Sequence, residues 1–268
     1  VWILLVLAQR LGISQALGAS RQGKLALLQI FARTIDQGSR LSAVRFAKSH
    51  AACEVLGLEK LDEDDLYENL AWIAKHQATI EKRLFDLRFP QATPTLFLYD
   101  VTSSYLEGTC NVLGTWGYNR DGKKGKMQIV VGLLTGPDGL PVAIRVFAGN
   151  TSDTQTVSEQ VRILAESFGV KQITLVGDRG MLKGPQIDSL PDGFRYITAI
   201  TKPQILKMLS NGVLQIDLYD SHVCEVALQG IRYVLRRNPM RAQQMAETRN
   251  SKFASVQKLV DQRNQYLA

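Results

Sequence analysis

Two aspartates constrain this chain more than any other residues, because each directly follows a short apolar run. Asp100 closes the run 96–99, and Asp178 closes the run 173–177. Runs of this length and composition are typical of buried strands. A carboxylate at the mouth of a buried strand is costly unless it is paired, hydrogen-bonded or bound to metal. Ligand sites of open α/β sheets also collect at the carboxyl ends of strands, so the pair predicts a divalent-metal site.

Charge and composition indicate which classes of binding partner the chain favours. The net charge of +7 and the pI near 9.3 favour a polyanion, with nucleic acid first and an acidic membrane surface second. Residues 201–268 hold ten Lys and Arg against five Asp and Glu. The N-terminal apolar run of eight residues is far short of the ~20 needed to span a bilayer, so we expect no membrane partner. The cysteines lie far apart, which fits a reducing cytosol and argues against disulfides and zinc.

The spacing of apolar residues along the chain predicts a helical N-terminal domain over 1–92, with breaks near 17–21 and 38–41 and a helix start near 61–65. Leucines at roughly helical spacing predict a core helix at the N-terminus; they are Leu4, Leu7, Leu11 and Leu17. Residues 93–210 are then predicted to form, in this order, three strands, a helix, a strand, a helix and a strand. Residues 211–268 are predicted to form an insertion of strands followed by a long polar helix, which leaves the core incomplete at its C-terminus.

That strand order is the ribonuclease-H-like arrangement. The predicted fold class is therefore α/β, with a ribonuclease-H-like (retroviral-integrase-like) catalytic core, a helical N-terminal domain and a β-containing insertion. The first and fourth strands are neighbours in such a sheet, so Asp100 and Asp178 should meet. Two close carboxylates stay ionised when a cation lies between them, and oxygen ligands favour magnesium or manganese. The alternative is that each aspartate merely caps a turn or a helix.

Four motifs, in order along the chain, carry a family resemblance. They are YDVTSSY at 99–105, GTWGYNRDG at 114–122, GNTSD at 149–153 and GDRGM at 177–181. Together they resemble the DDE transposases of bacterial insertion sequences, in particular the insertion-sequence-4-like group. The resemblance implies that Asp100 and Asp178 are the first two acids of a catalytic triad and bind two Mg²⁺ or Mn²⁺ ions. It also implies cut-and-paste transposition by strand cleavage and transfer on double-stranded DNA, at transposon ends and target. A bacterial cytoplasm with the protein at the nucleoid, and a homodimer, are implied in the same way.

The third acid is where the chain departs from that group. There it is a Glu in a pattern of Tyr, two residues, Arg, three residues, Glu, six residues, Lys. Here Tyr233 and Arg236 have the first spacing, but Met240 and Glu247 occupy the Glu and Lys positions. Glu247 is a weak candidate without the expected neighbours. We expect instead that the chain is a C-terminally truncated fragment and that the acid lies beyond Ala268.

The remaining motif residues predict DNA contacts. Basic and aromatic side chains of the 116–126 region should contact phosphate and stack on an unpaired base; they are Trp116, Tyr118, Arg120, Lys123, Lys124 and Lys126. By the resemblance, Asn150 binds DNA or a metal-bound water, although helix capping by residues 151–153 explains much of that motif. Arg179 is predicted to hold the neighbouring carboxylate or a phosphate, with a surface ion pair as the alternative.

Two rival hypotheses remain open. The first is a truncated, catalytically inactive DNA-binding remnant of a transposase, which would share the binding predictions but show no metal-dependent cleavage. The second is a magnesium phosphohydrolase in which Asp100 forms an aspartyl-phosphate. The run Asp100-Val101-Thr102 resembles part of a haloacid-dehalogenase motif, but that family has a second Asp where Thr102 stands here.

Overall fold

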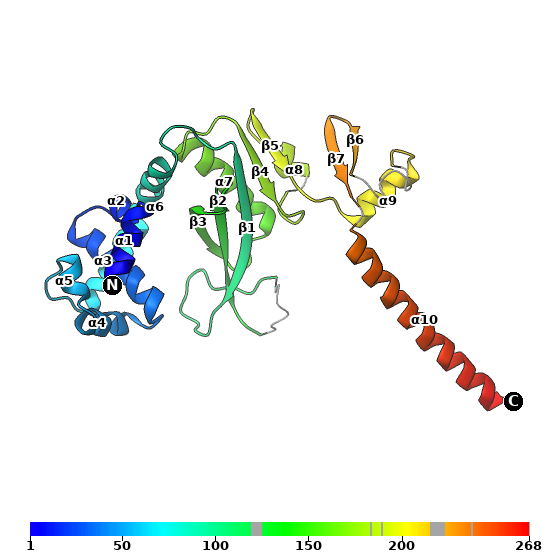
Figure 1. Ribbon diagram of the computed structural model, residues 1–268, viewed down its shortest axis with the longest axis horizontal. Coiled ribbons are helices and arrows are strands. Elements are labelled where there is room, and N and C mark those ends of the chain that lie inside the picture. The colour runs from blue at the N-terminus through cyan, green and yellow to red at the C-terminus, as the bar shows by residue number, and fades with distance from the viewer. Residues whose placement is uncertain (119–124, 183, 189, 215–222, 237, 268) are drawn as a thin grey trace. The chain divides into compact units, whose positions relative to one another are not determined.

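The computed structural model describes residues 1–118, 125–182, 184–188, 190–214, 223–236 and 238–267. The chain divides into two compact units, Val1–Ala199 and Ile200–Ala268, which are described separately below (Figure 1). Among the described residues, no helix combines the length and apolar character that crossing a membrane requires.

The first unit begins with a group of helices around a shared core. They are α1 (Trp2–Arg10), α2 (Ile13–Leu17), α3 (Arg21–Ile35), α4 (Arg40–Ser49), α5 (Ala52–Leu56) and α6 (Glu63–Arg88). The breaks predicted near 17–21 and 38–41 are confirmed. The predicted packing of α1 is wrong in part, because Leu7 and Leu11 are 44% and 52% exposed. Leu4, Leu5 and the buried Ala8 instead pack toward the core. Of the predicted leucines in α1, only Leu4 therefore lies on the face that meets the core.

Helix α6 links this helical core to the sheet. It starts with a capping box in which Asp65 N donates to Asp62 Oδ1 at 3.0 Å and Asp62 N donates to Asp65 Oδ2 at 3.1 Å. Its early residue Leu66 belongs to the helical core and its late residue Phe85 to the core of the sheet. The helix ends before Pro90, which disfavours helical backbone at the residue that precedes it.

A five-stranded sheet of order β3-β2-β1-β4-β5 follows. Its strands are β1 (Leu96–Tyr105), β2 (Gln128–Thr135), β3 (Pro141–Ala148), β4 (Ile173–Gly177) and β5 (Phe194–Ile197). β1, β2 and β3 pair antiparallel, whereas β4 is parallel to β1 and β5 is parallel to β4. The predicted adjacency of the first and fourth strands is therefore confirmed, and the α/β fold is ribonuclease-H-like. The turn 136–139 joins β2 and β3 as a hairpin, with Gly139 N donating to Gly136 O at 3.0 Å.

One face of the sheet is covered by the helix predicted between the third and fourth strands. It comprises α7 (Asp153–Arg162) and a π-helical turn, η1 (Ile163–Ser167). Residues of α7 and η1 share a core with alternate residues of β1, among them Phe97, Tyr99 and Val101. The short helix α8 (Gly184–Asp188) follows β4 and precedes β5 along the chain.

The second unit holds α9 (Lys202–Ser210), the hairpin β6 (Cys224–Leu228) and β7 (Ile231–Leu235), and α10 (Pro239–Leu267). The hairpin and the long polar helix match the sequence prediction. Helix α9 was not predicted, although Thr201 and Gln204 form a capping arrangement in which Thr201 N donates to Gln204 Oε1 at 2.7 Å. Of the region predicted to hold the strands of the insertion, residues 215–222 lie outside the described residues, and positions 213 and 214 are not strand.

Candidate functional site

Asp100 and Asp178 occupy equivalent positions on neighbouring parallel strands. The register pairs Tyr99 with Gly177, so the next step along each strand is Asp100 and Asp178. Adjacent strands lie about 4.8 Å apart, which makes Asp100 and Asp178 neighbours along the backbone at this edge. Both residues are exposed. The matched arrangement that the sequence predicted is thus present in the sheet.

The sequence was wrong about the local setting of Asp100, which was expected at the end of its strand. β1 continues to Tyr105, because residues beyond Asp100 pair with β2 as far as Gln128. On its other side, β1 loses its partner where β4 ends, after the pair Tyr99 and Gly177. Asp100 is therefore the first residue of β1 beyond its pairing with β4, and it pairs only with Leu133 of β2.

Local hydrogen bonds fix one oxygen of each carboxylate. Val101 N donates to Asp100 Oδ1 at 2.8 Å, and Arg179 N donates to Asp178 Oδ1 at 2.7 Å. The contact that the structure shows between Arg179 and Asp178 thus comes from the Arg179 amide, and the Arg179 side chain is exposed. The backbone turns at once after β4, with Met181 N donating to Asp178 O at 3.0 Å.

Asp153, which the sequence offered only as a helix cap, lies close to Asp178. A methyl group built on Gly180 would lie 3.5 Å from Asp153 Oδ2 and 3.8 Å from Asp178 Oδ2. The sequence signal for this position is the capping pair Ser152 and Gln155, which makes Asp153 the first residue of α7. In the structure Ser152 N donates to Gln155 Oε1 at 3.2 Å. Burial raises the pKa of the Tyr99 phenol to about 12, and the negative charges of Asp153 and Asp100 act in the same direction.

The oxygen donors at this edge fit a hard divalent cation such as Mg²⁺ or Mn²⁺. Asp100 and Asp178 supply two carboxylates to this edge. Within the described part of the chain, however, three or more Asp, Glu, His or Cys side chains do not come together as a complete metal-binding group. The weak candidate Glu247 lies in the second unit, on α10, where its Oε1 accepts a hydrogen bond from Gln243 at 3.0 Å.

The predicted DNA-contacting residues fall into three groups. Trp116 and Tyr118 are 63% and 81% exposed. Lys126 Nζ lies against the Glu107 carboxylate as an ion pair, and Asn150 is exposed, with its amide donating to Thr115 Oγ1 at 2.9 Å. The predictions for Arg120, Lys123 and Lys124 lie outside the described residues.

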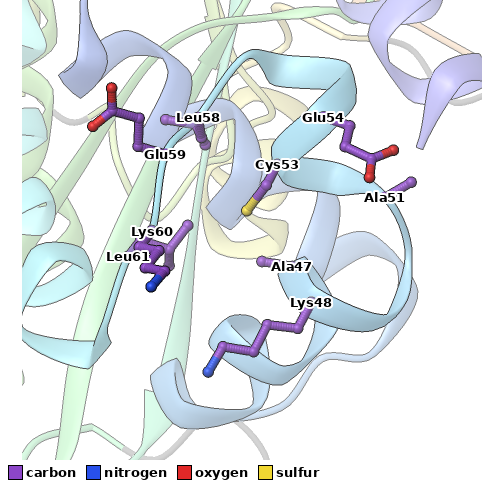
Figure 2. Close-up of a pocket in the computed structure, with 9 residues that line it drawn as sticks. All are labelled: Ala47, Lys48, Ala51, Cys53, Glu54, Leu58, Glu59, Lys60 and Leu61. Atoms are coloured by element: carbon purple, nitrogen blue, oxygen red, sulfur yellow. The ribbon is translucent and has the colours of Figure 1, made fainter.

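A hollow elsewhere in the first unit is a poor candidate for a site. It is lined by residues of α4, α5 and the segment that precedes α6 (Figure 2). Its charged lining consists of Lys48 and Lys60 with Glu54 and Glu59, so the charges offset one another. The polar groups around it therefore favour neither an anion nor a cation.

Comparison with known proteins identifies one family. A family model described as a transposase DDE domain matches residues 91–262, which is well over half of the chain. No curated protein matches the sequence.

Solved structures show weak overall similarity. A piggyBac transposase synaptic complex with hairpin DNA matches at 11% identity and a TM-score of 0.44, over 81% of this chain and 48% of that one. The chain thus spans about half the length of that protein. A Mos1 transposase paired-end complex with the left transposon end matches at 8% identity and a TM-score of 0.26, over 70% and 65% of the two chains. A simian T-cell lymphotropic virus intasome matches at 11% identity and a TM-score of 0.26, over 70% and 60%.

Proposed function

The chain belongs to the transposase DDE domain family, and from that premise we propose that it cuts and joins DNA in the transposition of an insertion sequence. The reaction is divalent-metal-dependent strand cleavage followed by strand transfer, in a cut-and-paste pathway. The observation that carries the proposal is the parallel register that sets Asp100 beside Asp178 at one edge of the sheet. Family membership also favours this function over an aspartyl-phosphate phosphohydrolase.

In this proposal Asp100 and Asp178 hold two Mg²⁺ or Mn²⁺ ions. Such ions activate the attacking oxygen and stabilise the leaving oxygen of a phosphodiester. The residues of the chain hold the two carboxylates in place, because the amides of Val101 and Arg179 each fix one carboxylate oxygen. The DNA strand is proposed to lie beside Asp100, beyond the end of β4. Fixed carboxylates need little rearrangement when the reacting groups arrive.

The third carboxylate is proposed to come from a segment that covers the face of the sheet opposite α7. Asp100 points to that face, because successive side chains of a strand alternate and Tyr99 packs toward α7. The same face carries Leu98, Leu133, Ile144 and Val146, which are 38%, 36%, 44% and 47% exposed. The register aligns Asp100 with Leu133 and Leu133 with Ile144. A segment packed on this apolar surface would pass directly over Asp100.

We propose double-stranded DNA, at both transposon ends and target, as the substrate, and a homodimer as the acting form. The four sequence motifs and the net charge of +7 support this proposal. The same motifs support assignment to the insertion-sequence-4-like group, with a bacterial host and a cytoplasmic, nucleoid-associated location.

Cleavage of a supercoiled plasmid that carries the DNA flanking the gene, in Mg²⁺ or Mn²⁺, tests the proposal. The variants are Asp100→Asn and Asp178→Asn, with Asp192→Asn, an exposed aspartate remote from the register pair, as the matched control. We expect cleavage that either site variant abolishes and the control retains. Cleavage that survives Asp100→Asn and Asp178→Asn would refute the assignment, and loss with Glu247→Gln would make Glu247 the third acid.

A second candidate function is a DNA-binding protein without cleavage activity. The absence of a complete acidic metal-binding group among the described residues favours it. It predicts salt-sensitive DNA binding, no cleavage with either metal, and the same DNA affinity in Asp100→Asn as in the unaltered chain. Mn²⁺ titration separates the two functions further, because a catalytic pair binds the ion and loses it in Asp100→Asn.

A further inference from the structure

One buried side chain, that of Gln128, holds the segment that presents Trp116 and Tyr118. Gln128 is the first residue of β2 and only 2% exposed. Its Nε2 donates to Tyr118 O at 3.0 Å and to Gly149 O at 2.9 Å. A single amide group thus ties the aromatic segment to the residue that follows β3.

Main-chain contacts reinforce this tie. Thr115 and Gln128 exchange backbone hydrogen bonds, at 3.1 Å for Thr115 N to Gln128 O and 3.0 Å for the reverse. Gly149 N donates to Leu113 O at 3.0 Å, and the next amide, of Asn150, donates to Thr115 Oγ1 at 2.9 Å. The described part of this segment, up to Tyr118, is therefore anchored on both sides, by β2 and by the residues that lead to α7.

The approach of the two chains leaves no room for side chains at their contact. A methyl group on Gly117 would lie 1.8 Å from Gly149 O, and one on Gly149 would lie 2.0 Å from Gln128 O. Both partners are backbone atoms that cannot move aside without breaking the hydrogen bonds above. Glycine at 117 thus allows the close approach of the aromatic segment to Gly149. Trp116 and Tyr118 directly precede and follow Gly117 in the sequence.

The rings themselves remain available. Trp116 is 63% and Tyr118 81% exposed, so most of each side chain is accessible to a partner. Aromatic rings on a fixed backbone lose little freedom when a base stacks on them, so the affinity of the stack is retained. Gln128 donates to the backbone oxygen of Tyr118, so it acts on the rings through the backbone that carries them.

We propose that Gln128 is a positioning residue for DNA binding: its amide fixes the Tyr118 backbone against Gly149, and so orients Trp116 and Tyr118 to stack on unpaired bases. The inference rests on the proposed function only in taking DNA as the partner. Its test measures binding of single-stranded DNA without cleavage, so a failure of the catalytic assignment leaves the result readable.

The test compares two buried glutamines. Gln128→Met removes both hydrogen bonds while keeping a side chain of similar length. Gln160→Met is the matched control, because Gln160 is likewise buried, at 0% exposed, and lies on α7 next to Tyr99 rather than at the aromatic segment. Binding of a fluorescently labelled oligothymidylate is measured by anisotropy. We expect Gln128→Met to weaken binding about tenfold, the scale of one lost base stack, and Gln160→Met to bind as the unaltered chain does.

A double-mutant cycle distinguishes positioning from general loosening of the fold. If Gln128 acts through the rings, Gln128→Met should weaken binding much less in the Trp116→Ala, Tyr118→Ala background than in the unaltered chain. Equal effects in the two backgrounds, or normal binding by Gln128→Met, would overturn the proposal. Should Gln128→Met fail to fold by circular dichroism, Gln128→Glu takes its place in the cycle. That variant keeps the shape of the side chain but removes the Nε2 group that donates to Tyr118 O and Gly149 O, and the same two outcomes decide.

Discussion

Breaking the ion pair of Glu81 and Arg145 should loosen the attachment of α6 to the sheet. Glu81 is 7% exposed. Its Oε1 accepts from Ile144 N at 3.1 Å, and both of its oxygens lie 2.9 Å from Arg145 Nη1. Because β3 is the edge strand of the sheet, these contacts also occupy a strand edge that would otherwise be open to pairing with another chain.

The variant Glu81→Met removes the carboxylate and keeps most of the volume. It leaves the Ile144 amide without its acceptor and the Arg145 guanidinium, whose side chain is only 19% exposed, without its main partner. Removing one member of a buried pair costs about 3–5 kcal/mol. Glu159 lies 3.9 Å from Arg145 Nε and offsets part of that loss. We therefore expect Glu81→Met to lower the free energy of unfolding by about 2–3 kcal/mol.

Urea unfolding followed by circular dichroism measures the effect. Lys82→Met is the control, since it breaks an exposed ion pair with Asp86 on the same helix, and such pairs contribute less than about 0.5 kcal/mol. The double variant Glu81→Met, Arg145→Met should recover part of the loss, because no unpaired charge remains buried. A cost for Glu81→Met no larger than that of the control would refute the reasoning.

Three further perturbations have defined outcomes. Hydrogen bonds from Arg21 and from the Asp62 amide lower the pKa of Asp65 below its ordinary 3.8, so Asp65→Asn should cost about 0.5–1 kcal/mol at neutral pH. That difference should fade as the pH falls from 3.8 through the lower folded-state pKa, which urea unfolding at a series of pH values checks. Gly149→Ala should cost more than about 2 kcal/mol by the same assay, whereas Gly108→Ala, with nothing within 4 Å, should change little. Gln229 and Gly230 both have positive φ, at 52° and 76°, so Gln229→Asn should slow amide hydrogen exchange across β6 and β7.

The sequence predicted the sheet well where the pattern is local. The glycine-rich turn 136–139 and its flanking apolar runs specify a hairpin without reference to the rest of the chain. The adjacency of β1 and β4 was expected from the ribonuclease-H-like order of elements. The register then aligns Asp100 with Asp178, because residues 96–99 pair with residues 174–177.

Prediction failed where the outcome depends on a distant partner. The strand of Asp100 was expected to end at that residue, because the polar run after it lacks apolar alternation. Those residues are strand nonetheless, since their backbone pairs with β2 up to Gln128. Gln128 itself was overlooked for the same reason: a single glutamine in an apolar strand gives no signal until Tyr118 and Gly149 are brought to it.

The two faces of the sheet decide which carboxylates can share a metal ion. Tyr99 packs into the core beneath α7, so Asp100 points to the opposite face. Asp153 begins α7 and therefore approaches from the helix-covered side, close to Asp178 across Gly180. Asp178, which follows the end of its strand, is bounded by neither face. In the proposed site, a third carboxylate that reaches Asp100 would therefore approach from the face with Leu133 and Ile144, and Asp153 is better placed to orient what binds Asp178 than to act as that third acid.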